Sequence, residues 1–250
     1  MEIDKTTLND LNIFNHEEEY SIFKNIDFTK TTNGNEQLKL NLSQPLSTIE
    51  QITDVQKTLQ SILNVAEKWP LHISNGTIMV VERFYETPIT PIPSIITNYN
   101  YRFYKLFHNE DCSFVKYSVS HCFDLVKGMM EILNLLKNEP TPTPLMNLLD
   151  ELVNMFTRDD LQIIGKNVSC KNLNDKETLQ LGYFFKYKFK YQMIRLLYLH
   201  STIDAWYGMA MATQHYNLSF PTFMESTQPF INIKNGYHLI LKSQYRIVLL

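Results

Sequence analysis

The chain has 250 residues, of which 44% are hydrophobic, which is enough for one large domain or two small ones with a buried core. Its net charge of −3 argues against a free-standing nucleic-acid-binding protein, because such proteins are usually basic, so we expect any DNA contact to be local. The three cysteines form no Cys-x-x-Cys pair, which predicts a reducing compartment and no metal site. The polar, acidic N-terminus is unlike a signal peptide, and no run of about 18 apolar residues could span a membrane. We therefore predict a cytoplasmic protein.

The first part of the chain is predicted to form short helices and then one clear amphipathic helix. Residues 17–26 begin with acids and continue with apolar side chains, an arrangement that suits a helix N-terminus. A turn at residues 27–34 leads into a leucine-bearing segment. The amphipathic helix covers residues 49–69, with Ser47 or Thr48 as its N-cap and apolar residues at every third or fourth position.

The pattern changes in the following segment. Residues 73–85 hold an Asn-Gly dipeptide beside a β-rich run, which favours a short β-hairpin. Three prolines between residues 88 and 93 predict an extended connector, because proline interrupts helices. Five aromatic residues between 98 and 108 then predict a short packed helix.

Two long helices are predicted in the second half of the chain. The first covers residues 110–138 and ends at a proline-rich segment, after which a shorter amphipathic helix lies at about 145–156. The second covers residues 174–216 without a proline, which gives a rod of roughly 60 Å at about 1.5 Å per residue. Beyond this rod the apolar residues alternate as they do in β-strands.

Together these elements predict a mainly α, elongated protein built around two long helices. Short β segments are expected only near residues 73–85 and at the C-terminal end. Because the pattern switches from helices to strands near its end, we divide the chain into a helical domain, residues 1–216, and a strand-rich segment, residues 217–250, that begins a following domain.

Aromatic and basic side chains alternate within the long rod, in the segment YFFKYKFKY at residues 183–191. As a strand, this segment would be a nucleic-acid platform of stacking rings and phosphate-pairing lysines. The uninterrupted helical pattern on both sides favours a helix, in which two apolar stripes would be buried. The stripes are Tyr183, Tyr187, Tyr191, Ile194 and Tyr198, and Leu181, Phe185, Phe189, Met193 and Leu196.

The basic residues of the rod are the only candidate binding site. At helical spacing Lys186 and Lys190 lie together on one side, with Lys188 and Arg195 on a flank. We interpret them as solvated side chains, with contact to DNA backbone phosphates as the alternative, since such contacts need only local positive charge.

The sequence holds no recognisable catalytic or metal-binding motif. Its seven histidines form neither H-x-x-x-H nor H-E-x-x-H, and no G-x-x-x-x-G-K-[S/T], G-x-G-x-x-G or G-x-S-x-G segment occurs. His121 and Cys122 are adjacent on a predicted helix and point in different directions, so a core thiol is a better interpretation than a catalytic pair. The acids at residues 17–19 and 159–160 are interpreted as capping or solvated groups. We therefore predict a non-enzymatic chain without a cofactor.

An ordered set of short motifs occupies residues 2–63. It consists of an acid-x-x-T-x-x-x-L opening, a T-x-x-G turn into a leucine-bearing helix, a Gln-Pro-Leu exit and a helix that begins I-x-x-I. Its members are Asp4, Thr7, Leu11, Thr31, Gly34, Leu38, Leu42, Gln44, Pro45, Leu46, Ile49 and Ile52. In this order and spacing they resemble the start of the core, or lever, domain of the MutS family of DNA mismatch repair proteins.

The resemblance implies a helical core that sends two lever helices outward, and residues 110–138 and 174–216 could fill these roles. The segment PFINIKNGYHLIL resembles the strand that leads from the lever into the family's ATPase domain, with His238 at the family histidine and Leu239 in place of the usual proline. ATP and Mg²⁺ are expected only for that ATPase domain, whose Walker A loop this chain lacks. The implied partners are double-stranded DNA, the adjoining ATPase domain and, through that domain, a second copy.

The resemblance gives the chain a mechanical function, in which rigid helices couple the nucleotide state of an adjoining ATPase domain to DNA or partner binding. A helical protein–protein interaction scaffold unrelated to DNA is the alternative. An enzyme with an unrecognised buried site is a third and weaker hypothesis, because the sequence supplies no set of catalytic groups.

Overall fold

The computed structural model describes residues 5–14, 21–226, 228, 230–239 and 247–249. Within these residues the protein is mainly α, as predicted, and has one two-stranded sheet. The helices are α1 (Lys5–Asp10), α2 (Ile22–Ile26), α3 (Thr32–Ser43), α4 (Ile49–Val65), α5 (Asn75–Glu86), α6 (Asn98–Phe107), α7 (Asn109–Leu136), α8 (Thr143–Phe156), α9 (Gln162–Lys166), α10 (Asp175–Tyr183) and α11 (Lys190–His215).

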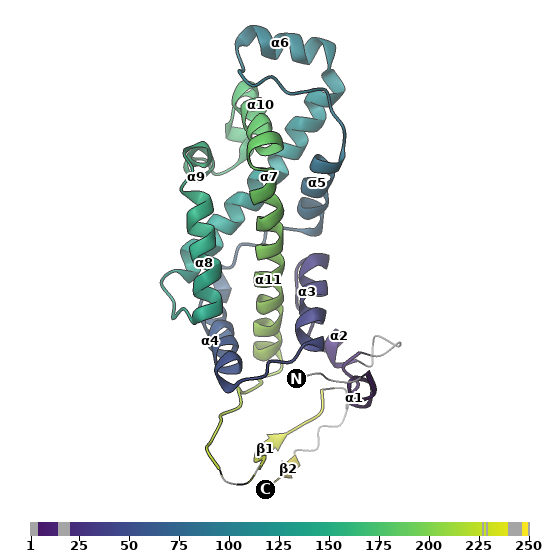
Figure 1. The fold of residues 1–250 in the computed structure, drawn as a ribbon, viewed down its shortest axis with the longest axis vertical. Coiled ribbons are helices and arrows are strands. Elements are labelled where there is room, and N and C mark those ends of the chain that lie inside the picture. Colours follow the sequence, from purple (N-terminus) through teal and green to yellow (C-terminus); the bar gives the residue numbers. More distant parts are fainter. Residues whose placement is uncertain (1–4, 15–20, 227, 229, 240–246, 250) are drawn as a thin grey trace.

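The two longest helices, α7 and α11, run along the bundle, and shorter helices pack around them (Figure 1). Helices α3 and α4 pack against α11, α5 and α10 pack against α7, and α8 contacts both α4 and α7. Helix α6 crosses the upper end of the bundle in this view, while the strands lie at the lower end. This arrangement confirms the predicted helical bundle with two long helices.

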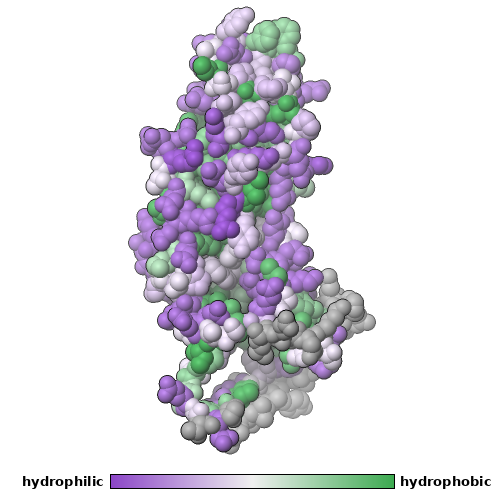
Figure 2. All heavy atoms as spheres, in the orientation of Figure 1, coloured by the Kyte–Doolittle hydropathy of each residue, from purple (hydrophilic) through white to green (hydrophobic). Residues whose placement is uncertain are grey.

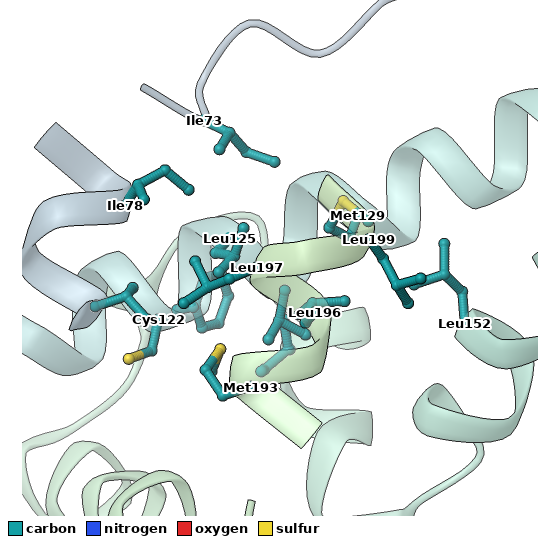
Figure 3. Close-up of a cluster of buried hydrophobic side chains, with 14 of the residues drawn as sticks. Ile73, Ile78, Cys122, Leu125, Met129, Leu152, Met193, Leu196, Leu197 and Leu199 are labelled. Carbon is teal, nitrogen blue, oxygen red and sulfur yellow. The ribbon is translucent and has the colours of Figure 1, made fainter. Parts of the chain in front are cut away.

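One continuous hydrophobic core joins the long helices (Figure 3). Leu125 and Met129 of α7 and Met193 and Leu196 of α11 are fully buried in it. Each such side chain stabilises the fold by about 1.5–3 kcal/mol relative to an exposed one, so this shared core is a major source of stability.

The predicted β-hairpin at residues 73–85 is wrong, because this segment is helix α5 (Asn75–Glu86). Ser74 is its N-cap and forms a capping box with Thr77, so the polar residues around the Asn-Gly dipeptide start a helix instead of closing a turn. The β-rich run then buries Val81 and Phe84, which are spaced for one helix face. Burial of that face outweighs the modest β-preference of its residues.

Other predicted helix starts agree with the structure. Thr48, one of the two candidate caps, accepts a hydrogen bond from the Gln51 N–H and begins α4. The predicted helix at residues 17–26 falls partly at positions outside the described residues, and its remainder is α2, capped by Ser21. Asp4 of the MutS-like opening also lies outside the described residues.

The predicted rod at residues 174–216 begins and ends where expected but is not one uninterrupted α-helix. Asn174 caps α10 with a capping box, and α11 ends beside Asn217, whose φ is 51°. Between α10 and α11 lies a π-helical segment, η5 (Phe184–Lys188), in which the Phe189 N–H donates to the Phe184 carbonyl at 3.0 Å. Such π segments change the face that the following side chains occupy.

The described residues beyond α11 form no further helix and include the short antiparallel strands β1 (Ile233–Gly236) and β2 (Ile247–Leu249), as predicted for the C-terminal end. The predicted strand YHLIL extends past position 239, outside the described residues. A hollow of about 870 Å³ in this region is lined, among the described residues, by 219–224, 226, 228 and 230–234, none of which belongs to a helix. In the part of the chain that the structure describes, no helix is both long and apolar enough to cross a membrane.

Candidate functional site

Lys186, the first of the predicted DNA-contacting residues, points into the protein. Its ammonium group donates to the carbonyl oxygens of Phe84 and of Thr87, the latter at 3.1 Å, and lies 4.9 Å from the centre of the Phe84 ring. Burial is the main reason that the pKa of Lys186 is lowered, and the nearby Lys190 charge adds to it. Lys186 therefore caps the C-terminal end of α5, where a positive charge is favourable, and its ammonium group is engaged by carbonyl oxygens of the protein.

Arg195 is also committed to an internal contact. Its guanidinium donates two hydrogen bonds to Glu151 of α8, at 2.7 and 2.8 Å, and lies 4.7 Å from the centre of the Tyr198 ring. The hydrogen bonds from Arg195 lower the pKa of the Glu151 carboxyl. The Glu151 carboxylate therefore neutralises the positive charge of Arg195, which a DNA phosphate would otherwise bind.

Lys188 and Lys190 are exposed, so the structure leaves two of the four predicted basic residues available to a phosphate backbone. The original set of Lys186, Lys188, Lys190 and Arg195 is thus not one surface. Sequence periodicity could not separate them, because the π segment shifts the faces and the partners of Lys186 and Arg195 are far away in the chain.

Only one of the two predicted apolar stripes of the rod is buried. Phe185, Phe189 and Met193 are fully buried in the core. The second stripe, by contrast, is largely exposed along η5 and the first half of α11. We call its exposed part the tyrosine face, which consists of Tyr187, Tyr191, Ile194 and Tyr198.

A buried carboxylate that the sequence did not single out ties α11 to the start of α3. Asp204 is 4% exposed, and its carboxylate accepts hydrogen bonds from the Lys30 N–H at 2.9 Å, the Thr31 N–H at 2.8 Å and the Thr31 hydroxyl at 2.7 Å. We call this arrangement of Asp204, Lys30 and Thr31 the Asp204 anchor. It fully engages the carboxylate, as a buried charge requires.

The Asp204 anchor explains the T-x-x-G motif. The Thr31 hydroxyl, which donates to Asp204, also accepts from the Gly34 N–H at 3.1 Å and so caps α3. A Cβ on Gly34 would lie 2.1 Å from a carboxylate oxygen of Asp204, so only glycine fits this close approach. Gly208, one turn further along α11, is similarly close to Thr29. Glycine at these two positions therefore allows the turn before α3 to pack closely against α11.

His200 lies one helical turn before Asp204, beside a cavity of about 10 Å³ that Lys30, Trp69 and Asp204 also line. The His200 ring is 5% exposed, and its Nδ1 has no hydrogen-bond partner among the described residues. Burial lowers the pKa of His200, and the Asp204 charge opposes this effect. The cavity is at the lower limit for one water molecule, which is too small for a substrate.

The buried cysteines add no activated thiol to these contacts. Cys122 and Cys170 are buried, and burial raises the pKa of both thiols, so neither is an activated nucleophile. Across the described ranges, no group of three or more His, Cys, Asp or Glu side chains is placed to hold a metal ion.

Comparison with known proteins gives no further identification, since no family model, no curated protein and no solved structure matches this chain.

Proposed function

We propose that this chain is the non-catalytic core and lever part of a MutS-like DNA mismatch repair protein. In this proposal α7 and α10–α11 are the lever helices, and they couple an adjoining ATPase domain to DNA or partner binding in the cytoplasm. Nucleotide and Mg²⁺ would bind only to that ATPase domain, and a homodimer would form through it.

The Asp204 anchor is the observation that carries the proposal. A lever transmits displacement only if its base is fixed, and Asp204 fixes the base of α11 to the turn before α3 with three hydrogen bonds. Two residues at this attachment, Thr31 and Gly34, belong to the set of motif residues that carries the resemblance to the MutS family. A motif of sequence and a point of mechanical attachment thus coincide.

A helical interaction scaffold is the second candidate, and the exposed aromatic residues favour it. Besides the tyrosine face, helix α6 exposes Tyr99, Phe103 and Phe107, whose rings stack along one side of the helix. Exposed apolar patches of this kind mark interaction sites. Figure 2 shows hydrophobic side chains at the end of the molecule where α6 lies.

DNA binding tests the first candidate. Anisotropy titrations of a labelled duplex of about 30 base pairs, at about 50 and 200 mM salt, would measure affinity and its salt dependence. Two phosphate contacts from Lys188 and Lys190 predict a log–log slope of about −1.8, which the double variant Lys188→Glu/Lys190→Glu should abolish. The control Lys57→Glu/Lys68→Glu makes the same charge change at exposed positions elsewhere. Equal affinity in both double variants would remove Lys188 and Lys190 from the proposal.

The ATPase connection has a separate test in the gene. We expect the reading frame to encode a G-x-x-x-x-G-K-[S/T] loop within about 40 codons after Leu250, because this loop binds the nucleotide phosphates. A stop codon at that point, in a locus without an ATPase gene, would contradict the lever proposal.

A further inference from the structure

The tyrosine face, which lies on η5 and the first half of α11, is an open apolar surface on helical segments whose other side is buried. Tyr191 is 83% exposed, and Tyr187, Ile194 and Tyr198 are between 44% and 51% exposed. The same helix buries Met193 and Leu196 on its opposite side. Four large side chains in a row on one face leave a contiguous surface that a partner could cover.

The spacing of the tyrosine face fits a helix. Its three members in α11, Tyr191, Ile194 and Tyr198, follow one another at intervals of three and four residues, which is the spacing of the apolar seam in a helix pair, and Tyr187 precedes them in η5. The face is about 16 Å long, since Tyr198 lies 11 residues after Tyr187 at a rise of about 1.5 Å per residue. A partner helix of about three turns would cover it completely.

Contacts within the protein hold much of this face in place before any partner arrives. The Tyr198 ring lies against the Arg195 guanidinium, which Glu151 fixes with two hydrogen bonds. At the other end, the Tyr187 hydroxyl accepts from the Ile92 N–H at 3.3 Å. Side chains that are already ordered lose less entropy on binding, so this surface is preorganised for docking.

Charges beside the face indicate what kind of helix fits. Lys188 directly follows Tyr187 and Lys190 directly precedes Tyr191, and both lysines are exposed, so positive charge borders the N-terminal part of the face. Charged residues that border an apolar seam are the positions at which helix pairs select partners by charge. Acidic flanks on the partner complement them, whereas a second copy would bring lysines against lysines.

The composition of the face disfavours a nucleic acid as its occupant. Ile194 lies in the middle of it and cannot stack on a base as an aromatic ring does. A protein helix suits this composition, because aliphatic and tyrosine side chains pack together.

We propose that the tyrosine face docks an amphipathic helix of another protein, with apolar residues at three- and four-residue spacing and Asp or Glu on its flanks. This inference does not depend on the resemblance to the MutS family or on DNA binding. It assigns α11 a second surface beside the buried one that the Asp204 anchor secures.

Two stapled peptides of about 21 residues would test the docking, each with Leu at the seam positions and either Glu or Lys at the flanking positions. Calorimetric titration should show that the Glu-flanked peptide binds at least about 10-fold more tightly than the Lys-flanked one. Lys188→Glu/Lys190→Glu should reverse this preference. No binding of either peptide, or equal binding of both, would overturn the proposal.

A single-residue variant locates the docking surface. Tyr191→Ala should weaken binding of the Glu-flanked peptide about 10-fold, because a central tyrosine commonly anchors an interface. Tyr99→Ala on α6 is the matched control, since Tyr99 is 76% exposed, and it should leave the affinity unchanged. Loss of binding in the control instead would move the site to α6 and overturn the assignment.

Measurements on the same variant also test whether a second copy of the chain or a nucleic acid covers the tyrosine face instead. A concentration-dependent dimer in analytical ultracentrifugation that Tyr191→Ala disperses would show that a second copy covers the face. A loss of duplex-DNA affinity in Tyr191→Ala as large as its loss of peptide affinity would show a nucleic-acid surface. Either result would overturn the proposal, while the lever function, tested at Lys188 and Lys190 and in the gene, would stand or fall separately.

Discussion

The two halves of α11 use the same helix in opposite ways. In its lower half, residues 199–212, nearly every side chain is buried, and Asp204 holds the turn before α3. In its upper half, one side packs in the core while the tyrosine face is open to solvent. The difference shows that a long helix can be an internal support at one end and a surface at the other. Substitutions in the two halves should therefore have different consequences.

Loss of the Asp204 carboxylate should have the largest effect. Asp204→Ala leaves the Thr31 N–H and hydroxyl buried without their acceptor and opens space beside Gly34. We expect the free energy of unfolding to fall by about 5 kcal/mol, measured by urea denaturation followed by circular dichroism.

Asp150→Ala is the control for the change in net charge, because Asp150 is exposed on α8, and it should change stability by less than about 0.5 kcal/mol. A loss below about 1 kcal/mol in Asp204→Ala would mean that the anchor contributes little to the fold.

A pair of substitutions two residues apart separates the two sides of upper α11. Phe189→Ala removes a fully buried ring and should cost about 4 kcal/mol of unfolding free energy. Tyr191→Ala removes an exposed ring and should cost less than about 0.5 kcal/mol. Similar losses from both, in the same denaturation experiment, would show that the tyrosine face is packed and not available to a partner.

The close approach of α3 to α11 predicts a smaller loss at Gly34. In Gly34→Ala the new methyl group would push against Asp204, and we expect a loss of about 2 kcal/mol with a lower melting temperature. Gly165→Ala is the matched control, because its Cβ would meet nothing within 4 Å, and alanine should stabilise α9 slightly. Unchanged stability in Gly34→Ala would refute the tight fit of turn and helix.

The smallest predicted effect is a pH dependence that originates at His200. Burial lowers the pKa of His200 below its ordinary value of 6.5. Below about pH 6.5 the unfolded chain therefore binds a proton that the folded protein does not, so acidification favours unfolding until the folded pKa is reached.

Stability measured between about pH 7.5 and pH 5.5 should consequently fall less in His200→Leu than in the unmodified protein. Equal pH dependence in the two proteins would show that His200 accepts its proton in the folded state without penalty.

The sequence predicted the helical part of this fold well where local signals and burial agree. Thr48 marks the start of α4, Asn174 the start of α10, and prolines end α7, so these boundaries follow from capping and proline chemistry. The hairpin prediction at residues 73–85 failed because the Asn-Gly dipeptide lies in the first turn of a helix that Ser74 caps. An Asn-Gly dipeptide occurs both in hairpin turns and in the first turn of a helix, and burial of the following apolar face favours the helix here.

The site was less predictable because its contacts join distant parts of the chain. Asp204 lies 173 residues from Thr31, and no spacing rule relates them. One signal was available, since Asp204 is the only Asp, Glu, Lys or Arg in α11 after Arg195 and a buried carboxylate must have hydrogen-bond donors. The two apolar stripes of the rod have similar residues, so periodicity alone could not show which one is covered.

Amide hydrogen exchange at Lys30 and Thr31 tests the central claim most directly. Both N–H groups donate to Asp204, so the account predicts that they exchange as slowly as the amides of residues 199–212 in α11. Rapid exchange of these two amides while α11 stays protected would contradict the claim that Asp204 fixes the base of the helix.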